Sequence, residues 1–248
     1  MSGIFHSLIV IVLCLFSTTA IAGPTVDELL LAADNMARGD HSIVEAEMHV
    51  KTARYERKTS MTIWASGQEK TLIKITSPAK SAGMATLKVD QNIWNYMPRS
   101  GRTMKIPSGM MGGNWMGSHF SNDDLVKESR MSEDFDAEIV STPDQNPEGN
   151  YVIVATPKPD APVVWGKIEA HISSDRLPVS FLYYDESGTL MRTMLFSDVQ
   201  VFDGQKMPAQ MKMSVSDKPG EFTMFTYHSV DYSTDVPDST FTKQALRK

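Results

Sequence analysis

The chain has 248 residues, a formal net charge of −6 and a single cysteine. Its Lys and Arg residues are scattered along the sequence and form no basic cluster. The chain therefore lacks the positive patch through which proteins bind nucleic acids or anionic lipid headgroups, and we expect no nucleic-acid partner. The length suits one all-β domain with a sizeable core.

The first residues have the pattern of a secretory leader. An apolar run over residues 8–16 is followed by an A-x-A cleavage pattern that ends at Ala22. The run is too short to span a bilayer, which takes about 20 residues. We expect a signal peptide of residues 1–22 and one periplasmic domain of residues 23–248. That domain has no cysteine, because the only one lies in the leader.

The domain opens with a predicted amphipathic helix. Thr25 and Glu28 have the spacing of a capping box, and Gly39 ends the segment. The apolar positions share one helical face and are Val26, Leu29, Leu30, Ala33, Met36 and Ala37. This stripe predicts that the helix lies on a sheet.

Strand patterns then recur about every ten residues, separated by Gly, Pro and Ser, which is typical of an antiparallel meander. They cover residues 43–51, 55–64, 69–76, 84–89, 93–96, 102–106, 151–156, 164–172, 179–185, 190–201, 207–215 and 222–230. The acidic segment 133–148 is rich in turn formers and is predicted as a loop, and residues 244–247 as a small closing helix. About eleven strands make a large antiparallel sheet, which must curl or close to bury a face.

Residues 94–125 form the most unusual stretch. Trp94 and Tyr96 begin a hairpin, which is followed by a loop over residues 109–117 that interleaves four glycines with Met110, Met111, Trp115 and Met116. Flexible backbone that carries large apolar groups predicts contact with an apolar ligand. Ser121 is placed to cap a short helix whose first turn is acidic.

This stretch resembles the LolA-like family of outer-membrane lipoprotein-sorting proteins, in its broader branch rather than the LolA carrier itself. The matching residues are Trp94, Tyr96, Pro98, Arg102, Ile106, Gly117, Ser118, Phe120, Ser121, Asp124 and Leu125. Two positions depart from the family, where His119 replaces a more frequent Asp and Asn122 a frequent aromatic residue. The resemblance implies a mainly β fold, in which the curved sheet forms a half-open, incomplete barrel wrapped around a few short helices.

A cavity in such a half-barrel would bind an apolar ligand. The residues predicted to line the cavity and its loop are Trp94, Tyr96, Met104, Ile106, Met110, Met111, Trp115, Met116, Phe120 and Leu125. The residues predicted to dock a partner or a lipid headgroup are Arg99, Arg102 and Lys105, with a solvated hairpin as the alternative. The chain has 17 methionines, whose flexible thioethers suit variable apolar ligands. For Met211, Met213 and Met224 the alternative is ordinary core packing.

Motifs for catalysis are absent from the sequence. Ser77 and Lys80 have Ser-x-x-Lys spacing but lack the partner motifs of penicillin-binding enzymes, and no Gly-x-Ser-x-Gly or His-Glu-x-x-His occurs. We expect no enzymatic activity and no cofactor.

The sequence favours a monomeric periplasmic carrier that shields a lipid or the acyl chains of a lipoprotein. The resemblance implies an inner-membrane transporter as partner, of the resistance-nodulation-division or lipoprotein-exporting type. Two alternatives stay open. One is a lipid-responsive sensor or adaptor of a membrane transporter, and the other is copper(I) binding by Met110, Met111, Met116 and His119.

Overall fold

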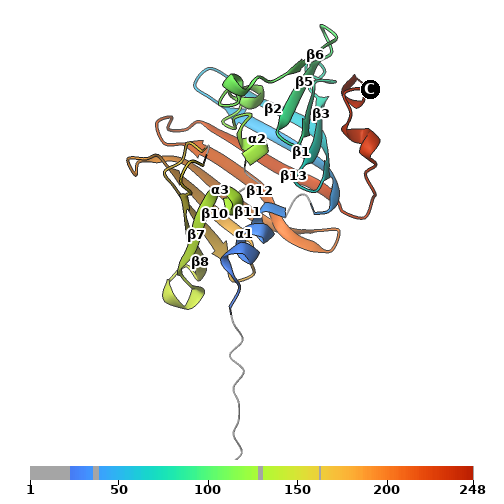
Figure 1. Ribbon diagram of the computed structural model, residues 1–248. Coiled ribbons are helices and arrows are strands. Elements are labelled where there is room, and N and C mark those ends of the chain that lie inside the picture. Colours follow the sequence, from blue (N-terminus) through green and yellow to red (C-terminus); the bar gives the residue numbers. More distant parts are fainter. Residues whose placement is uncertain (1–22, 36–38, 128–130, 162, 248) are drawn as a thin grey trace, which may run out of the picture.

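The computed structural model describes residues 23–35, 39–127, 131–161 and 163–247 (Figure 1). Within them the chain forms thirteen strands. These are β1 (His41–Lys51), β2 (Glu56–Ser66), β3 (Lys70–Ser77), β4 (Ala85–Val89), β5 (Asn92–Met97), β6 (Arg102–Lys105), β7 (Phe135–Ser141), β8 (Asn150–Pro157), β9 (Lys167–Ser173), β10 (Pro178–Tyr184), β11 (Leu190–Phe202), β12 (Gln205–Val215) and β13 (Phe222–Asp231).

Helices are few and short. The α-helices are α1 (Val26–Asn35), α2 (Asp124–Lys127) and α3 (Met131–Asp134). The 3-10 helices are η1 (Ser108–Met110), η2 (Trp115–Gly117), η4 (Pro143–Gln145), η5 (Asp238–Phe241) and η6 (Ala245–Arg247). No helix of the described ranges is long and apolar enough to cross a membrane.

All thirteen strands belong to one antiparallel sheet in the order β6-β5-β4-β3-β2-β1-β13-β12-β11-β10-β9-β8-β7. The first and last strands of the chain therefore pair in the middle of the sheet, and β6 and β7 form its edges. Residues 106–134 connect these two edges, and their helices α2 and α3 lie with α1 between the two halves of the curved sheet (Figure 1). The expected fold class, a large curved open sheet around short helices, is confirmed.

The N-terminal helix begins at the predicted capping box. The backbone N–H of Thr25 donates to Glu28 Oε2 at 3.0 Å, and the N–H of Glu28 donates to Thr25 Oγ1 at 3.2 Å. Leu29 and Leu30 of α1 are buried in the main core. Val26 and Ala33 of the predicted stripe pack against the same core. Met36 and Ala37, and the signal peptide with its cleavage site, lie outside the described residues.

Strand β7 was not predicted, because it lies in the acidic segment expected to be a loop. Its residues alternate, with Ala137 and Ile139 packed against the main core and Asp136 and Glu138 on the other face. Charged side chains on an edge strand disfavour pairing with another chain. Here they also alternate with the apolar residues, so the segment is acidic in the sequence and does not stand out as a strand. The closing helix expected at residues 244–247 is the 3-10 turn η6.

The sheet has an apolar core on each of its two faces. The main core lies on the concave face, where the strands pack against Leu29, Trp115 and Phe120. A smaller core lies on the other face of β3, β4 and β5, where the C-terminal segment covers it. Its buried members are Leu72, Ala85, Leu87, Val236, Phe241 and Leu246. Consequently β4 is buried on both faces.

Candidate functional site

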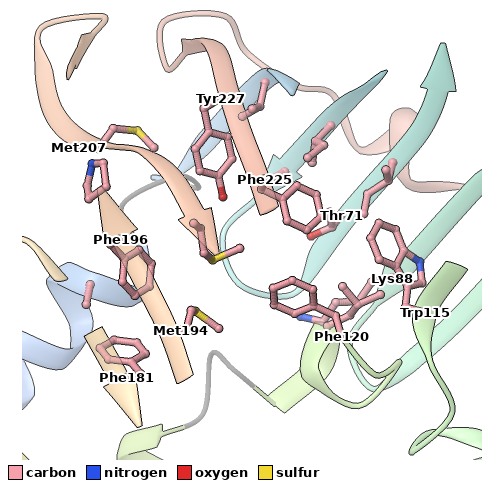
Figure 2. A pocket seen from close by; sticks show the side chains of 18 of the residues that line it. Thr71, Lys88, Trp115, Phe120, Phe181, Met194, Phe196, Met207, Phe225 and Tyr227 are labelled. Atoms are coloured by element: carbon pink, nitrogen blue, oxygen red, sulfur yellow. The ribbon is translucent and has the colours of Figure 1, made fainter. Parts of the chain in front are cut away.

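An apolar cavity lies on the concave face of the sheet, between its two halves (Figure 2). Its empty volume, including the part open to solvent, is about 1390 Å³. Ligand sites in proteins are lined mostly by apolar and aromatic side chains with a few polar groups, and the lining of this cavity has that character. The lining residues are Ala33, Val44, Ile63, Ala65, Thr71, Ile73, Thr86, Lys88, Trp115, Phe120, Leu125, Met131, Phe181, Tyr183, Met194, Phe196, Met207, Pro208, Met211, Phe225 and Tyr227.

Strand alternation produces one wall of the cavity. Every second residue of a strand points to the same face, and the register places Phe196 of β11 beside Met211 of β12, and Met211 beside Phe225 of β13. These neighbours make a continuous apolar stripe across three strands. On β10, Phe181 extends it and contacts Phe196 edge to face, with ring centroids 5.3 Å apart.

Two aromatic residues from the connection between the edge strands cover part of the cavity. Trp115 is 1% exposed and stacks on Phe225, with ring centroids 6.3 Å apart and an interplanar angle of 17°. Phe120 meets the same ring edge to face at 5.6 Å. The indole Nε1–H of Trp115 donates to Thr86 Oγ1 at 3.1 Å, which satisfies the polar atom of this buried side chain. We call residues 115–120 the roof.

The roof is a tight turn with internal hydrogen bonds. The N–H of Trp115 donates to the carbonyl of Phe120 at 2.7 Å, and Ser118 Oγ donates to the carbonyl of Trp115 at 2.8 Å. Met116 and Gly117 both have positive φ, at 47° and 66°. These contacts explain why Gly117 and Ser118 belong to the sequence motif.

The helix after the roof is capped as predicted. The N–H of Asp124 donates to Ser121 Oγ at 3.0 Å, and the N–H of Ser121 donates to Asp124 Oδ2 at 2.6 Å. Arg192 of β11 also donates to Asp124 Oδ2, at 2.9 Å. The motif residues Ser121 and Asp124 thus tie the connection to the opposite half of the sheet.

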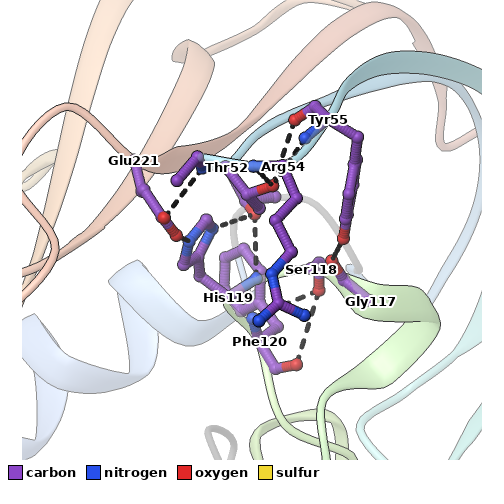
Figure 3. A network of polar contacts seen from close by, with 10 residues as sticks. Thr52, Arg54, Tyr55, Gly117, Ser118, His119, Phe120 and Glu221 are labelled. Atoms are coloured by element: carbon purple, nitrogen blue, oxygen red, sulfur yellow. Dashed lines mark hydrogen bonds and ion pairs between the residues drawn. The ribbon is translucent and has the colours of Figure 1, made fainter.

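A network of polar contacts attaches the roof to the rim of the sheet (Figure 3). His119 is buried, with Nδ1 2.9 Å from Thr223 Oγ1 and Nε2 3.2 Å from Glu221 Oε2. The other oxygen of Glu221 accepts the backbone N–H of Ala53 at 2.8 Å. The Ala53 N–H and then His119 hold the pKa of the Glu221 carboxyl below its usual value. We call His119, Glu221 and Thr223 the latch.

Two more contacts to the roof come from Tyr55, in the turn between β1 and β2, and from Arg57 of β2. The hydroxyl of Tyr55 donates to the carbonyl of Gly117, and the guanidinium of Arg57 donates to the carbonyl of Met116. The ring of Tyr55 also lies 5.6 Å from the guanidinium carbon of Arg57. The roof is therefore held through its backbone as well as through its histidine.

The structure brings only some of the predicted site residues together. Trp115, Phe120 and Leu125 line the cavity. Trp94 and Tyr96 instead pack against the smaller core on the opposite face, because alternation along β5 directs Ile93 and Asn95 to the concave side.

The remaining predicted residues lie outside the lining. Met116 packs against the main core, Ile106 and Met111 are half-buried, and Met104 and Met110 are 47% and 60% exposed. The residues predicted for docking, Arg99, Arg102 and Lys105, are exposed on the β5–β6 hairpin. Lys105 Nζ lies 5.9 Å from the ring centroid of Trp94.

Most of the lining was not predicted, although part of it left a signal in the sequence. The adjacent apolar residues Met194, Leu195 and Phe196 break the usual alternation, as does the segment 222–227, and both segments contribute to the wall. Thr71 and Lys88 gave no such signal, because polar residues in a strand are usually assigned to the solvent face.

Within the residues described, no group of three or more His, Cys, Asp or Glu side chains could hold a metal ion. Both ring nitrogens of His119 contact protein oxygens, so this residue is poorly placed to ligate copper(I).

Comparison with known proteins assigns the chain to a family. The sequence model of a family described as "-like: Uncharacterized protein" matches residues 67–248, well over half of the chain. The chain belongs to this family. No curated protein matches the sequence.

Several solved structures share the fold over nearly the whole chain. A DUF1329 family protein from Desulfovibrio piger is 21% identical with a TM-score of 0.76, and the match covers 88% of this chain and 96% of that one. A putative outer membrane lipoprotein-sorting protein domain from Vibrio parahaemolyticus is 20% identical with a TM-score of 0.72, covering 87% and 95%. A LolA superfamily protein from Nitrosomonas europaea is 21% identical with a TM-score of 0.72, covering 90% and 100%. The predicted LolA-like resemblance is confirmed for the fold.

Proposed function

We propose that this protein is a periplasmic carrier that shields a lipid, or the acyl chains of a lipoprotein, in the cavity beneath the roof. The observation that supports it most directly is an apolar cavity in a LolA-superfamily fold, lined by flexible Met and aromatic side chains. The chemistry is binding and release without a covalent step. The leader pattern of residues 1–22 supports the periplasmic location.

Transfer would follow mass action from a donor to an acceptor. Each methylene buried in the cavity contributes about 0.8 kcal/mol of favourable free energy, so a long chain binds tightly and release limits transfer. The roof contacts the sheet through hydrogen bonds to its rim, and opening these contacts would expose Trp115 and Phe120 together with the ligand. We propose that an acceptor or an inner-membrane transporter drives this opening.

The β5–β6 hairpin is the proposed docking element. Arg99, Arg102 and Lys105 are exposed there, in a chain whose net charge is −6, and Met104 and Met110 are exposed nearby in the sequence. This local positive charge would attract an acidic partner surface or anionic headgroups. We include these five residues in the proposed site as the first contacts outside the cavity.

Native mass spectrometry with lipid extraction would test the carrier function, using residues 23–248 purified from the periplasm without detergent. We expect a lipid or acylated peptide to copurify. Phe196→Asp puts a charge in the cavity wall and should abolish copurification and the uptake of a fluorescent fatty acid. Leu195→Asp is the matched control, because this neighbouring residue is 47% exposed and absent from the lining.

The proposal fails if the wild-type protein emerges without lipid and takes up neither fluorescent fatty acid nor purified lipoprotein. It also fails if both variants, shown to be folded by circular dichroism, retain the ligand equally.

A further inference from the structure

The cavity is polar at one end. Thr71 and Lys88 lie beside Trp115, whereas Phe181, Phe196 and Met207 lie at the other end (Figure 2). Thr71 and Lys88 are direct neighbours in the register of β3 and β4, so their side chains share the concave face. The cavity wall therefore carries a cation and a hydroxyl at one end and apolar side chains at the other.

Lys88 brings a positive charge to this end. It is 4% exposed, and it is the penultimate residue of β4, so its ammonium lies close to the turn between β2 and β3. There Lys88 Nζ donates to the backbone carbonyl of Gln68. An ammonium has three N–H donors on a rotatable stem, which lets it hold a carbonyl and approach a ligand oxygen together.

Thr71 supplies a second donor at the same end. Its hydroxyl lines the cavity and makes no hydrogen bond to any described residue. Thr86 differs, because its hydroxyl accepts the indole N–H of Trp115 and donates to Asn95 Oδ1 at 2.7 Å. Among the described residues, the polar end therefore brings the Lys88 ammonium and the Thr71 hydroxyl to the same part of the wall.

We propose that Lys88 and Thr71 bind the anionic head of a single-chain lipid, whose tail extends toward Phe181 and Phe196. This assignment rests on the proposed carrier function and names its ligand class. A carboxylate or phosphate oxygen accepts a charge-assisted hydrogen bond from Lys88, which is stronger inside an apolar cavity than in water. The hydroxyl of Thr71 donates to a second oxygen of the same head.

Displacement of a fluorescent fatty acid by four ligands with the same sixteen-carbon chain would test this assignment. The ligands are hexadecanoate, hexadecyl phosphate, hexadecanol and hexadecylamine, tested on residues 23–248 of the wild-type chain. We expect the two anions to bind about tenfold tighter than the alcohol, and the amine to bind weakest. The tighter of the two anions identifies the head as a carboxylate or a phosphate.

Variants then locate the head. Lys88→Met should bring the affinity for the anions down to that for hexadecanol and leave hexadecanol binding unchanged, whereas Lys88→Arg should keep the preference. Lys74→Met is the matched control, since Lys74 lies on the opposite face of β3 with its Nζ 5.6 Å from the Trp64 ring. Thr71→Val should weaken anion binding alone by a few fold, and this milder change serves if Lys88→Met does not fold.

The possible failures are distinct. If wild-type protein binds hexadecanoate and hexadecanol equally, or folded Lys88→Met and Thr71→Val variants keep the full anion preference, the head site is overturned and the carrier function stands. If none of the four ligands binds, the carrier function fails with it.

Discussion

Gly117 determines the geometry of the roof at the scale of a single residue. Its φ of +66° lies in the left-handed region, and a Cβ at this position would lie 2.9 Å from the hydroxyl oxygen of Tyr55. The same hydroxyl donates to the Gly117 carbonyl. The close approach that makes this hydrogen bond possible therefore depends on the missing side chain.

Gly117→Ala should destabilise the protein by about 1–2 kcal/mol through backbone strain alone, and further through the displaced Tyr55. Gly112→Ala is the control, because Gly112 is exposed and its Cβ would meet no atom within 4 Å. Urea unfolding followed by circular dichroism would measure both free energies. Equal stability of the two variants would show that the turn at Gly117 is not held as described.

The latch acts at the scale of elements, because it joins the roof to β13 and to the turn between β1 and β2. Glu221 connects the roof to that turn, since one of its carboxylate oxygens contacts His119 and the other accepts the backbone N–H of Ala53. The pKa of Glu221 is lowered from its ordinary value of 4.5. The folded state therefore binds a proton less readily than the unfolded state does.

Glu221→Gln should reduce the loss of stability in acid. A lowered carboxyl pKa contributes stability that is fully present above about pH 4.5 and is lost as the pH falls through the folded-state value. We expect the variant to be less stable than wild type at neutral pH. We also expect it to lose less stability than wild type does when the pH is lowered to about 3. Thermal unfolding midpoints at both pH values would measure this difference.

Glu186→Gln provides the comparison for that experiment, because Glu186 is exposed in the turn between β10 and β11. If Glu221→Gln and Glu186→Gln change the acid sensitivity to the same extent, the latch does not contribute through its carboxylate.

Local patterns predicted most elements but not which face of a strand borders the cavity. The capping box of α1 and the Ser121 cap involve residues three positions apart, so the sequence contains both partners. Strand β5 is a case in which the local pattern is not enough. Ile93 and Trp94 are adjacent and both apolar, so alternation alone does not show which of them faces the concave side. The C-terminal segment that covers Trp94 is about 150 residues away in the chain, and such a long-range contact has no local signature.

At the scale of the whole molecule, one sheet supports two cores with different roles. The concave core contains the cavity, which opens to solvent, whereas the smaller core is covered by η5 and η6. Strands β3 and β4 belong to both, since Leu72 and Leu87 face the smaller core while Thr71 and Lys88 face the cavity. Stability and ligand binding can therefore be changed separately.

Phe241→Ala is the variant that tests this separation. Phe241 of η5 is buried in the smaller core, so its truncation should lower the free energy of unfolding by about 3–5 kcal/mol. Because the residue does not line the cavity, the affinity for a fluorescent fatty acid should stay within about twofold of wild type. Phe196→Asp should show the opposite pattern, with a larger effect on the affinity for the ligand than on the free energy of unfolding. A folded Phe241→Ala protein with a large loss of affinity would mean that the two faces are coupled through β3 and β4, and that the C-terminal segment helps to shape the cavity.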